Sequence, residues 1–297
     1  MSRNQLFKRK AIVRIGPAIV IDRDSFKFTF EVPFDDNTEP NEIKVEIYNL
    51  SRETIAAIRK NDKLTIEAGY VSDDTGIICS GRVTKFTTST SGLDKITTVY
   101  AIDSQDLDEK TIASKTYASG TKASYILKDL AGKLGIPIAI IDIEQDVTYP
   151  QGWTVDGKIT DEMQKVAVHC GVSVYVNKGY LYVRSLDDGD DAYFELSVET
   201  GLLDSPEEFY EEEEITEEDQ KYVTTKKGKR KLKKVKDKTV IEVHGYKCKC
   251  LLQHRITTAS IIDLKSKEAN GKYRVRNGTH KFDTDFVTEF ECVDSQG

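Results

Sequence analysis

The residues that most suggest chemistry begin with a short segment bounded by glycines. Gly152–Lys158 has the two glycines and the lysine of a phosphate-binding loop. That loop also needs a serine or threonine after the lysine to hold magnesium, but Ile159 occupies this position. The preceding Tyr149 and Pro150 are a poor end for a buried strand. We interpret the segment as a chance match.

Two histidines and two cysteines near the C-terminus have zinc-ligand types and a symmetric spacing. They are His244, Cys248, Cys250 and His254. Their apolar neighbours indicate a β-strand, in which these even-numbered residues share one face. At about 3.3 Å per residue the two histidines would then lie about 30 Å apart, too far for one tetrahedral ion. We expect strand packing and neither a metal nor another cofactor, although a bend in the strand would reopen the zinc hypothesis.

Two further groups could support catalysis, but neither forms a motif. His169 and Cys170 are adjacent, and neighbours on a helix point about 100° apart, so they cannot form a nucleophile–base pair directly. A dyad assembled from distant residues stays open. Glu144 and Asp146 near Trp153 come nearest to a sugar-cleaving carboxylate pair, a combination that ordinary surfaces often show. We therefore predict no catalytic residues and no enzymatic activity.

Composition excludes several classes of protein. The 297 residues suffice for two or three domains, and the net charge of −7 argues against a general nucleic-acid binder. The apolar stretch Ala11–Ile21 is interrupted by Arg14 and Pro17, so no secretion signal is expected. No run reaches the roughly 18 apolar residues of a membrane span, so membrane insertion is not expected. The five scattered cysteines are expected to be reduced and packed as small hydrophobes.

Residues 1–108 are predicted to form an N-terminal β-barrel domain. Apolar and polar residues alternate there with the period of two that is typical of half-buried strands. The expected strands are Lys10–Ile15, Phe26–Val32, Ile43–Ile47, Leu64–Ala68, Gly81–Thr84 and Thr97–Ile102. A short helix should begin at Ser51, whose hydroxyl can cap it. Six strands and one helix favour a small barrel or a strongly bent sheet.

Residues 109–190 are predicted to form a compact α/β module. Apolar residues at helical spacing place a first helix over 123–134, ended by Gly135 and Pro137. A second helix should begin at Thr160 as its cap. The expected strands are Pro137–Ile143, Val172–Val176 and Tyr180–Val183, the last two joined by a turn at Asn177–Gly179.

Residues 191–297 are predicted to form a C-terminal β-barrel domain. The expected strands are Phe194–Val198, Thr239–Val243, Tyr246–Leu252, Ser260–Leu264, Tyr273–Val275 and Phe286–Cys292. His280 is expected in a loop or at a strand end. The predicted fold is thus mainly β with α+β, two small barrels flanking the α/β module.

The C-terminal domain carries a charged insert over residues 207–238. Nine acidic residues between Glu207 and Asp219 are followed by eight lysines and Arg230 between Lys226 and Lys238, on either side of Gly228. Opposite blocks joined by a turn favour a long β-hairpin, because facing Glu and Lys side chains each contribute roughly 0.2–1 kcal/mol. The alternatives are a disordered segment, or a basic arm that contacts DNA or the acidic surface of a partner.

Several segments, taken in order, resemble the phage baseplate-hub family, also called the late control protein D-like tail-hub family. At the N-terminal end, a strand runs into Tyr48, Asn49, Leu50 and Ser51 as in the family's strand-to-helix corner. The C-terminal positions that match the family's motifs are Gly201, Ser205, Pro206, Tyr246, Leu251, Leu252, Tyr273, Val275 and His280. The chain departs from the family at 256–259, where Ile-Thr-Thr-Ala replaces the usual Pro-Gly loop.

The resemblance implies a structural hub of a phage or phage-like contractile particle. In that family a homotrimer of chains with two barrels each forms a pseudo-six-fold ring, which joins the tail tube to a central spike or tail fibre among other baseplate proteins. DNA would pass through its channel without specific binding. The expected location is the virion tail tip, after assembly in the host cytoplasm. The alternatives are a tail-associated cell-wall hydrolase and a module that binds host-surface glycans.

Overall fold

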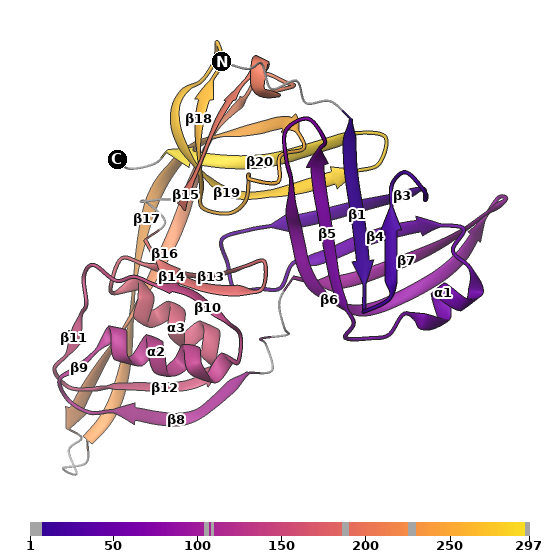
Figure 1. Ribbon diagram of the computed structural model, residues 1–297. Coiled ribbons are helices and arrows are strands. Elements are labelled where there is room, and N and C mark those ends of the chain that lie inside the picture. Colours follow the sequence, from indigo (N-terminus) through magenta and orange to yellow (C-terminus); the bar gives the residue numbers. More distant parts are fainter. Residues whose placement is uncertain (1–7, 104–106, 108–109, 186–189, 225–229, 295–297) are drawn as a thin grey trace.

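The computed structural model describes residues 8–103, 107, 110–185, 190–224 and 230–294. The N-terminal strands, the C-terminal strands and a middle part that carries α2 and α3 lie side by side (Figure 1). The N-terminal elements are β1 (Arg9–Ile15), β2 (Ile19–Asp22), β3 (Phe28–Phe34), β4 (Glu42–Tyr48), α1 (Arg52–Ala57), β5 (Lys63–Tyr70), β6 (Thr75–Ser91) and β7 (Asp94–Ile102). Each expected N-terminal strand is present, and the chain is mainly β.

The middle of the chain contains two helices and several short strands, called the helical module below. Its elements are β8 (Thr111–Tyr117), β9 (Thr121–Lys122), α2 (Ala123–Leu134), β10 (Ile138–Ile141), β11 (Thr148–Tyr149), β12 (Trp153–Lys158), α3 (Ile159–Val168), β13 (Ser173–Asn177) and β14 (Tyr180–Arg184). One buried cluster unites α2 and α3 with the strands around them, and it includes Trp153, Met163 and Leu130. In the described residues no helix is long and apolar enough to cross a membrane.

The start of α3 differs from the prediction. The residue that caps it is Lys158, and the N–H of Ile159 donates to the carbonyl oxygen of Lys110. Thr160 lies inside the first turn and is fully buried. The expected cap at Thr160 is therefore wrong: Lys158 holds the N-cap position, and the carbonyl oxygen of Lys110, not a capping hydroxyl, satisfies the first N–H of the helix.

The C-terminal part consists mainly of strands. Its elements are β15 (Asp190–Ser197), the short helix η1 (Val198–Thr200), β16 (Glu207–Thr224), β17 (Arg230–Leu251), β18 (Ser260–Lys265), β19 (Asn270–Phe282) and β20 (Phe286–Asp294). The two strands expected over 239–252 are one, because Gly245 does not break β17. A Cβ there would lie 2.2 Å from the carbonyl oxygen of Cys292, so the glycine permits the close approach of β20.

The N-terminal and C-terminal strands belong to a single sheet. Its order is β16-β17-β20-β19-β3-β4-β7-β6-β5-β1-β2, and the join is the antiparallel pairing of β19 with β3, in which Phe282 faces Phe30. Among the described strands β2 and β16 are the two edges of this path, so the sheet does not close into a barrel.

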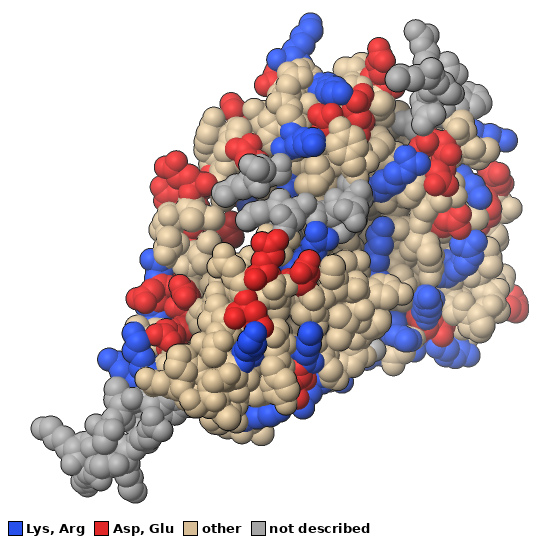
Figure 2. Space-filling model, turned by 60° about the vertical axis from the view of Figure 1, so that its left-hand side comes forward, with Lys and Arg blue, Asp and Glu red and all other residues tan. Residues whose placement is uncertain are grey.

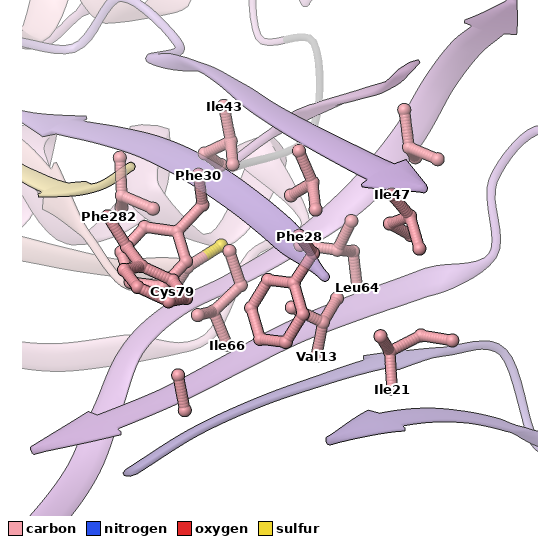
Figure 3. Packing of buried hydrophobic residues seen from close by; sticks show 14 of the residues in the cluster. Val13, Ile21, Phe28, Phe30, Ile43, Ile47, Leu64, Ile66, Cys79 and Phe282 are labelled. Atoms are coloured by element: carbon pink, nitrogen blue, oxygen red, sulfur yellow. The ribbon is translucent and has the colours of Figure 1, made fainter. Parts of the chain in front are cut away.

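The core of the N-terminal strands is completed from the other end of the chain. Phe282 of β19 lies beside Phe30 and Cys79, among residues of β1, β3 and β5 (Figure 3). Its ring centroid is 5.5 Å from that of Phe28 and 5.6 Å from that of Phe30. Phe286 and Leu252 are also fully buried in this cluster. The first and last parts of the sequence therefore share one core.

Candidate functional site

The charged insert forms a two-stranded ribbon, defined here as β16 with residues 230–244 of β17. The two strands pair antiparallel from Glu207 opposite Lys247 to Thr224 opposite Arg230, which confirms the predicted hairpin. The expected turn around Gly228 lies outside the described residues. Eighteen residues of strand at about 3.3 Å each make the ribbon roughly 60 Å long. It passes the helical module and extends beyond β8 and β12 (Figure 1).

The pairing register places only the end of the acidic block, residues 217–219, opposite the basic block. Residues 211–214, four consecutive glutamates that we call the acidic base, face 240–243, with Glu212 opposite Glu242. The lysine-rich stretch 231–238, which we call the basic tip, faces 216–223, with Lys221 opposite Lys233. The expected facing of Glu and Lys therefore occurs at Glu218 opposite Lys236, but the four glutamates of the acidic base do not face lysines. The physical reason is the register of the hairpin. It places the acidic base opposite residues 240–243, which come after the last lysine of the basic block.

The ion pairs that form across the ribbon are diagonal. Lys238 Nζ lies 2.6 Å from Glu214 Oε1, and Lys234 Nζ lies 3.2 Å from Glu218 Oε1. Each lysine is displaced by two residues from the position opposite its partner, a distance that long side chains can span. Arg276 of β19 lies near two further glutamates of the acidic base. The acidic base nevertheless retains an excess of negative charge, and the basic tip retains an excess of positive charge.

A histidine clamp fastens the ribbon to the sheet. His244 Nδ1 lies 2.8 Å from Asp294 Oδ2 on β20, and its Nε2 lies 3.0 Å from Glu208 Oε1 on β16. The hydrogen bond to Asp294, followed by that to Glu208, raises the pKa of His244 against the opposing effect of partial burial. The ring of Tyr210 covers His244 at a centroid distance of 4.7 Å. One imidazole thus links three adjacent strands.

The distal half of the ribbon is docked on the helical module. The buried side chain of Gln220 accepts a hydrogen bond from Thr154 N at 2.9 Å and donates one to Thr154 O at 2.6 Å. The buried Glu218 faces Lys165 of α3 at 3.9 Å, and Lys165 also donates to the buried Glu162 at 2.6 Å. The side-chain amide of Gln220 thus bonds the N–H and the C=O of Thr154, as a neighbouring strand would.

Three parts of the molecule meet at a buried polar junction. The turn of the helical module contributes Asn177, whose amide oxygen accepts from Thr257 Oγ1 at 3.2 Å. The loop after β17 contributes Thr258, whose hydroxyl donates to Asp35 O at 2.8 Å. The loop over residues 35–41 also accepts a bond from Val176 N. These contacts fix the N-terminal strands, the module and the C-terminal strands relative to one another.

The N-terminal positions of the resemblance form a corner between β4 and α1. Asn49 has φ +58°, and its side chain donates to Asp94 at 2.8 Å and accepts from Lys95 N at 2.9 Å. Ser51 Oγ accepts from Thr54 N at 3.1 Å and caps α1 as predicted. Leu50 is buried in the N-terminal core, and Lys27 covers the ring of Tyr48.

The C-terminal positions gather along β17 and β19. Tyr246, Tyr273 and Val275 share one buried cluster with Leu202, and the two tyrosine rings lie 5.1 Å apart. Leu252 instead enters the N-terminal core, and Leu251 packs against it. Before β16 lie Gly201, whose carbonyl oxygen accepts from Leu251 N, the exposed Ser205 and the buried Pro206.

His280 contradicts its expected position. It lies within β19 and is almost completely buried, with Nδ1 2.9 Å from Thr288 Oγ1 and its ring 5.0 Å from that of Phe34. Burial lowers the pKa of His280 to about 3, so it is neutral at ordinary pH. The sequence could not indicate this because the pairing with β3 that covers it joins residues about 250 positions apart.

The residues considered for chemistry have structural roles. Trp153–Lys158 is the strand β12, paired with β8, and not a phosphate-binding loop. His169 Nδ1 lies 2.9 Å from Tyr149 Oη, while Asp146 accepts from both N and Oγ of Ser124. In the described part of the chain no three His, Cys, Asp or Glu side chains are grouped to hold a metal ion.

The cysteines and the histidines considered as zinc ligands also have structural roles, in different parts of the molecule. All five cysteines are free and buried, as expected. Cys248 and Cys250 lie in the core beside β20, whereas His254 lies 3.9 Å from Asp74 of the N-terminal half. The even spacing of these residues therefore reflects one face of β17 and the loop that follows it.

Comparison with known proteins identifies the family. A sequence model of the family described as baseplate hub gp41 matches residues 43–213, which is more than half of the chain. The chain belongs to this family. It is accordingly a bacteriophage baseplate hub protein, a structural component of the tail. No curated protein sequence matches it.

Solved structures share the fold of this hub protein. A tail protein from Neisseria meningitidis MC58 aligns over 97% of both chains with a TM-score of 0.60 at 10% identity. The 43 kDa tail protein of prophage MuSo2 from Shewanella oneidensis aligns over 97% of this chain and 100% of its own, with a TM-score of 0.63 at 9% identity. A type VI secretion component from E. coli, similar to the T4 tail proteins gp27 and gp5, aligns over 95% and 76%, with a TM-score of 0.53 at 9% identity.

Proposed function

We propose that this baseplate hub protein is a non-enzymatic connector, which forms a homotrimeric ring between the tail tube and the central spike or fibre. Its two β-rich halves, residues 1–108 and 191–297, would each supply one of six units around the ring, with residues 109–190 as the module between them. Three chains with two such units each present pseudo-six-fold symmetry, which can match a six-fold tube above and a three-fold spike below.

The observation that supports this proposal most directly is the single sheet that joins both halves. The pairing of β3 with β19 and the shared core around Phe282 hold the two halves in one fixed relation. A symmetry adaptor needs this rigidity, because two units on a flexible linker would not keep a constant angle between neighbouring positions of a ring. The two halves of this single open sheet would take the place of the two closed barrels that the resemblance implies.

Charge on the surface agrees with a connector through which DNA passes without specific binding. On the face seen in Figure 2, acidic and basic side chains are interspersed. The net charge of −7 also disfavours retention of a polyanion. We expect assembly in the host cytoplasm, before the protein becomes part of the virion tail.

Native mass measurement of the purified chain, alone and with the tube protein of the same particle, tests the proposal. The expected species has three times the 33.5 kDa chain mass and binds the tube protein as an intact ring. A chain that keeps its single-chain mass at every concentration, with and without the tube protein, would contradict the trimer. Release of fragments from purified peptidoglycan would contradict the non-enzymatic role.

A further inference from the structure

The ribbon has one unpaired backbone edge on each of its strands. Among the described strands β16 pairs only with β17, so the outer edge of β16 is open along the acidic base. β17 pairs with β20 only from Gly245 onward, so its residues 230–244 are open on the side away from β16. An exposed edge of N–H and C=O groups is a template for pairing with another chain.

The same region exposes apolar side chains that the protein itself does not cover. Tyr210 is 72% exposed, Val240 58% and Ile241 39%; Val240 and Ile241 face the acidic base, and Tyr210 directly precedes it. Their exposure on a ribbon that is otherwise highly charged indicates a surface that a partner covers.

From the offset charges, the open edges and the exposed apolar residues we infer that the ribbon is a contact between copies of this chain. The basic tip of one copy seats against the acidic base of the next. This inference rests on the proposed trimer and names the surface that would close it.

Electrostatics selects this head-to-tail arrangement. Pairing two acidic bases would place glutamates opposite glutamates, and pairing two basic tips would place lysines opposite lysines, both of which are destabilising. A tip-to-base contact joins opposite charges and leaves each copy with one free tip and one free base. Such a heterologous contact forms a ring of three when it rotates each copy by a third of a turn relative to the last. The ribbon is roughly 60 Å long and passes the helical module (Figure 1), so the tip lies at the far side of the module from the C-terminal strands.

Charge reversal tests the contact. Lys233→Glu with Lys236→Glu reverses the tip, and Glu212→Lys with Glu213→Lys reverses the base. Either pair alone should raise the protein concentration for half-assembly about tenfold in sedimentation velocity, and added salt should weaken wild-type assembly. The variant with all four substitutions exchanges the charges of tip and base. Its concentration for half-assembly should lie within about threefold of that of the wild type. A Lys60→Glu/Lys267→Glu control, which makes the same charge change on other exposed lysines, should leave assembly unchanged.

Disulfide cross-linking supplies a second measurement. Within one chain, residue 236 lies six residues from the position opposite residue 212, a separation of about 20 Å that a disulfide cannot span. A Glu212→Cys/Lys236→Cys variant should therefore form only cross-links between chains, up to a covalent ring of three. A Leu93→Cys variant, with its thiol at the fully exposed turn between β6 and β7, should give no such ring.

The outcomes separate this inference from the proposed trimer. A wild-type trimer that is insensitive to both charge reversals and forms no cross-links would overturn the ribbon contact alone. A wild-type protein that never assembles would overturn the trimer itself. A tip variant that loses binding to duplex DNA and keeps its assembled mass would assign the basic tip to nucleic acid and reject the contact between copies.

Discussion

Ala259 holds a backbone conformation that alanine tolerates poorly. It has φ +66° in the loop between β17 and β18, and it is fully buried, with its N–H donating to Val275 O. This is the loop in which the family's usual Pro-Gly is replaced, and the structure shows that the last position still has the left-handed conformation that glycine favours.

Replacing Ala259 with glycine should stabilise the protein. Relief of the left-handed strain, roughly 1–2 kcal/mol, outweighs the extra backbone entropy of an unfolded glycine, so the free energy of unfolding should rise by about 0.5–1 kcal/mol. Chemical denaturation measures the change. Ala101→Gly, in the interior of β7, is the matched control and should destabilise. A loss of stability in Ala259→Gly would contradict the assigned backbone conformation.

His244 should make stability depend on pH. Its pKa is raised in the folded state, so its contribution is complete below its unfolded pKa of about 6.5 and is lost as the pH rises through the higher folded value. His244→Gln should therefore destabilise most near pH 6 and least near pH 9. Urea midpoints of both proteins across this range give the difference directly, and a difference that stays constant with pH would refute the clamp.

At the scale of elements, local patterns predicted most strands and helices correctly. Alternation located β1 and β3 to β7, helical spacing located α2, and Asn177–Gly179 located the turn between β13 and β14. Long-range relations were beyond these patterns. The register of the ribbon depends on its turn, and Gly245, which looks like a strand break, is required by the backbone of β20. The clamp at His244 was missed because its two carboxylates lie on other strands, about 36 and 50 residues away.

Gln220 should control how firmly the ribbon is docked on the helical module. Gln220→Ala removes both hydrogen bonds to Thr154, and each backbone group left unsatisfied costs about 1–3 kcal/mol when it is not reached by water. Hydrogen exchange should accelerate over β12 and the distal ribbon, while β1 to β7 keep their protection. Lys221→Ala, at the exposed neighbouring position, should show little change. Equal exchange in the two variants would show that this bond pair does not hold the ribbon.

At the scale of the whole molecule, an acidic residue lies where the N-terminal strands meet the helical module. Asp103 accepts hydrogen bonds from both N and Nδ2 of Asn41, and a Cβ at Gly179 of the module would lie 3.5 Å from its carbonyl oxygen. Burial raises the pKa of Asp103 to about 6, despite these hydrogen bonds.

The negative charge of Asp103 should therefore lower the free energy of unfolding at neutral pH. The raised pKa favours the protonated form in the folded state, so stability is greatest below about pH 4 for this group and is lost as the pH rises through 6. Asp103→Asn should increase the free energy of unfolding by about 1–2 kcal/mol at pH 7.5 and by almost nothing at pH 4. Thermal denaturation at the two pH values measures this. A variant that is less stable at pH 7.5 would show that the charge is required at the junction.

The pairing of β3 with β19 has a consequence for synthesis. A ribosome makes β3 about 250 residues before Phe282, so the core of the nascent N-terminal strands stays uncovered until β19 has been synthesised. A prematurely terminated product that stops before β19 would lack both the strand beside β3 and the aromatic rings that fill this core. Such truncated chains would then fail to present a finished surface to a growing particle, and only chains that include β19 would be incorporated.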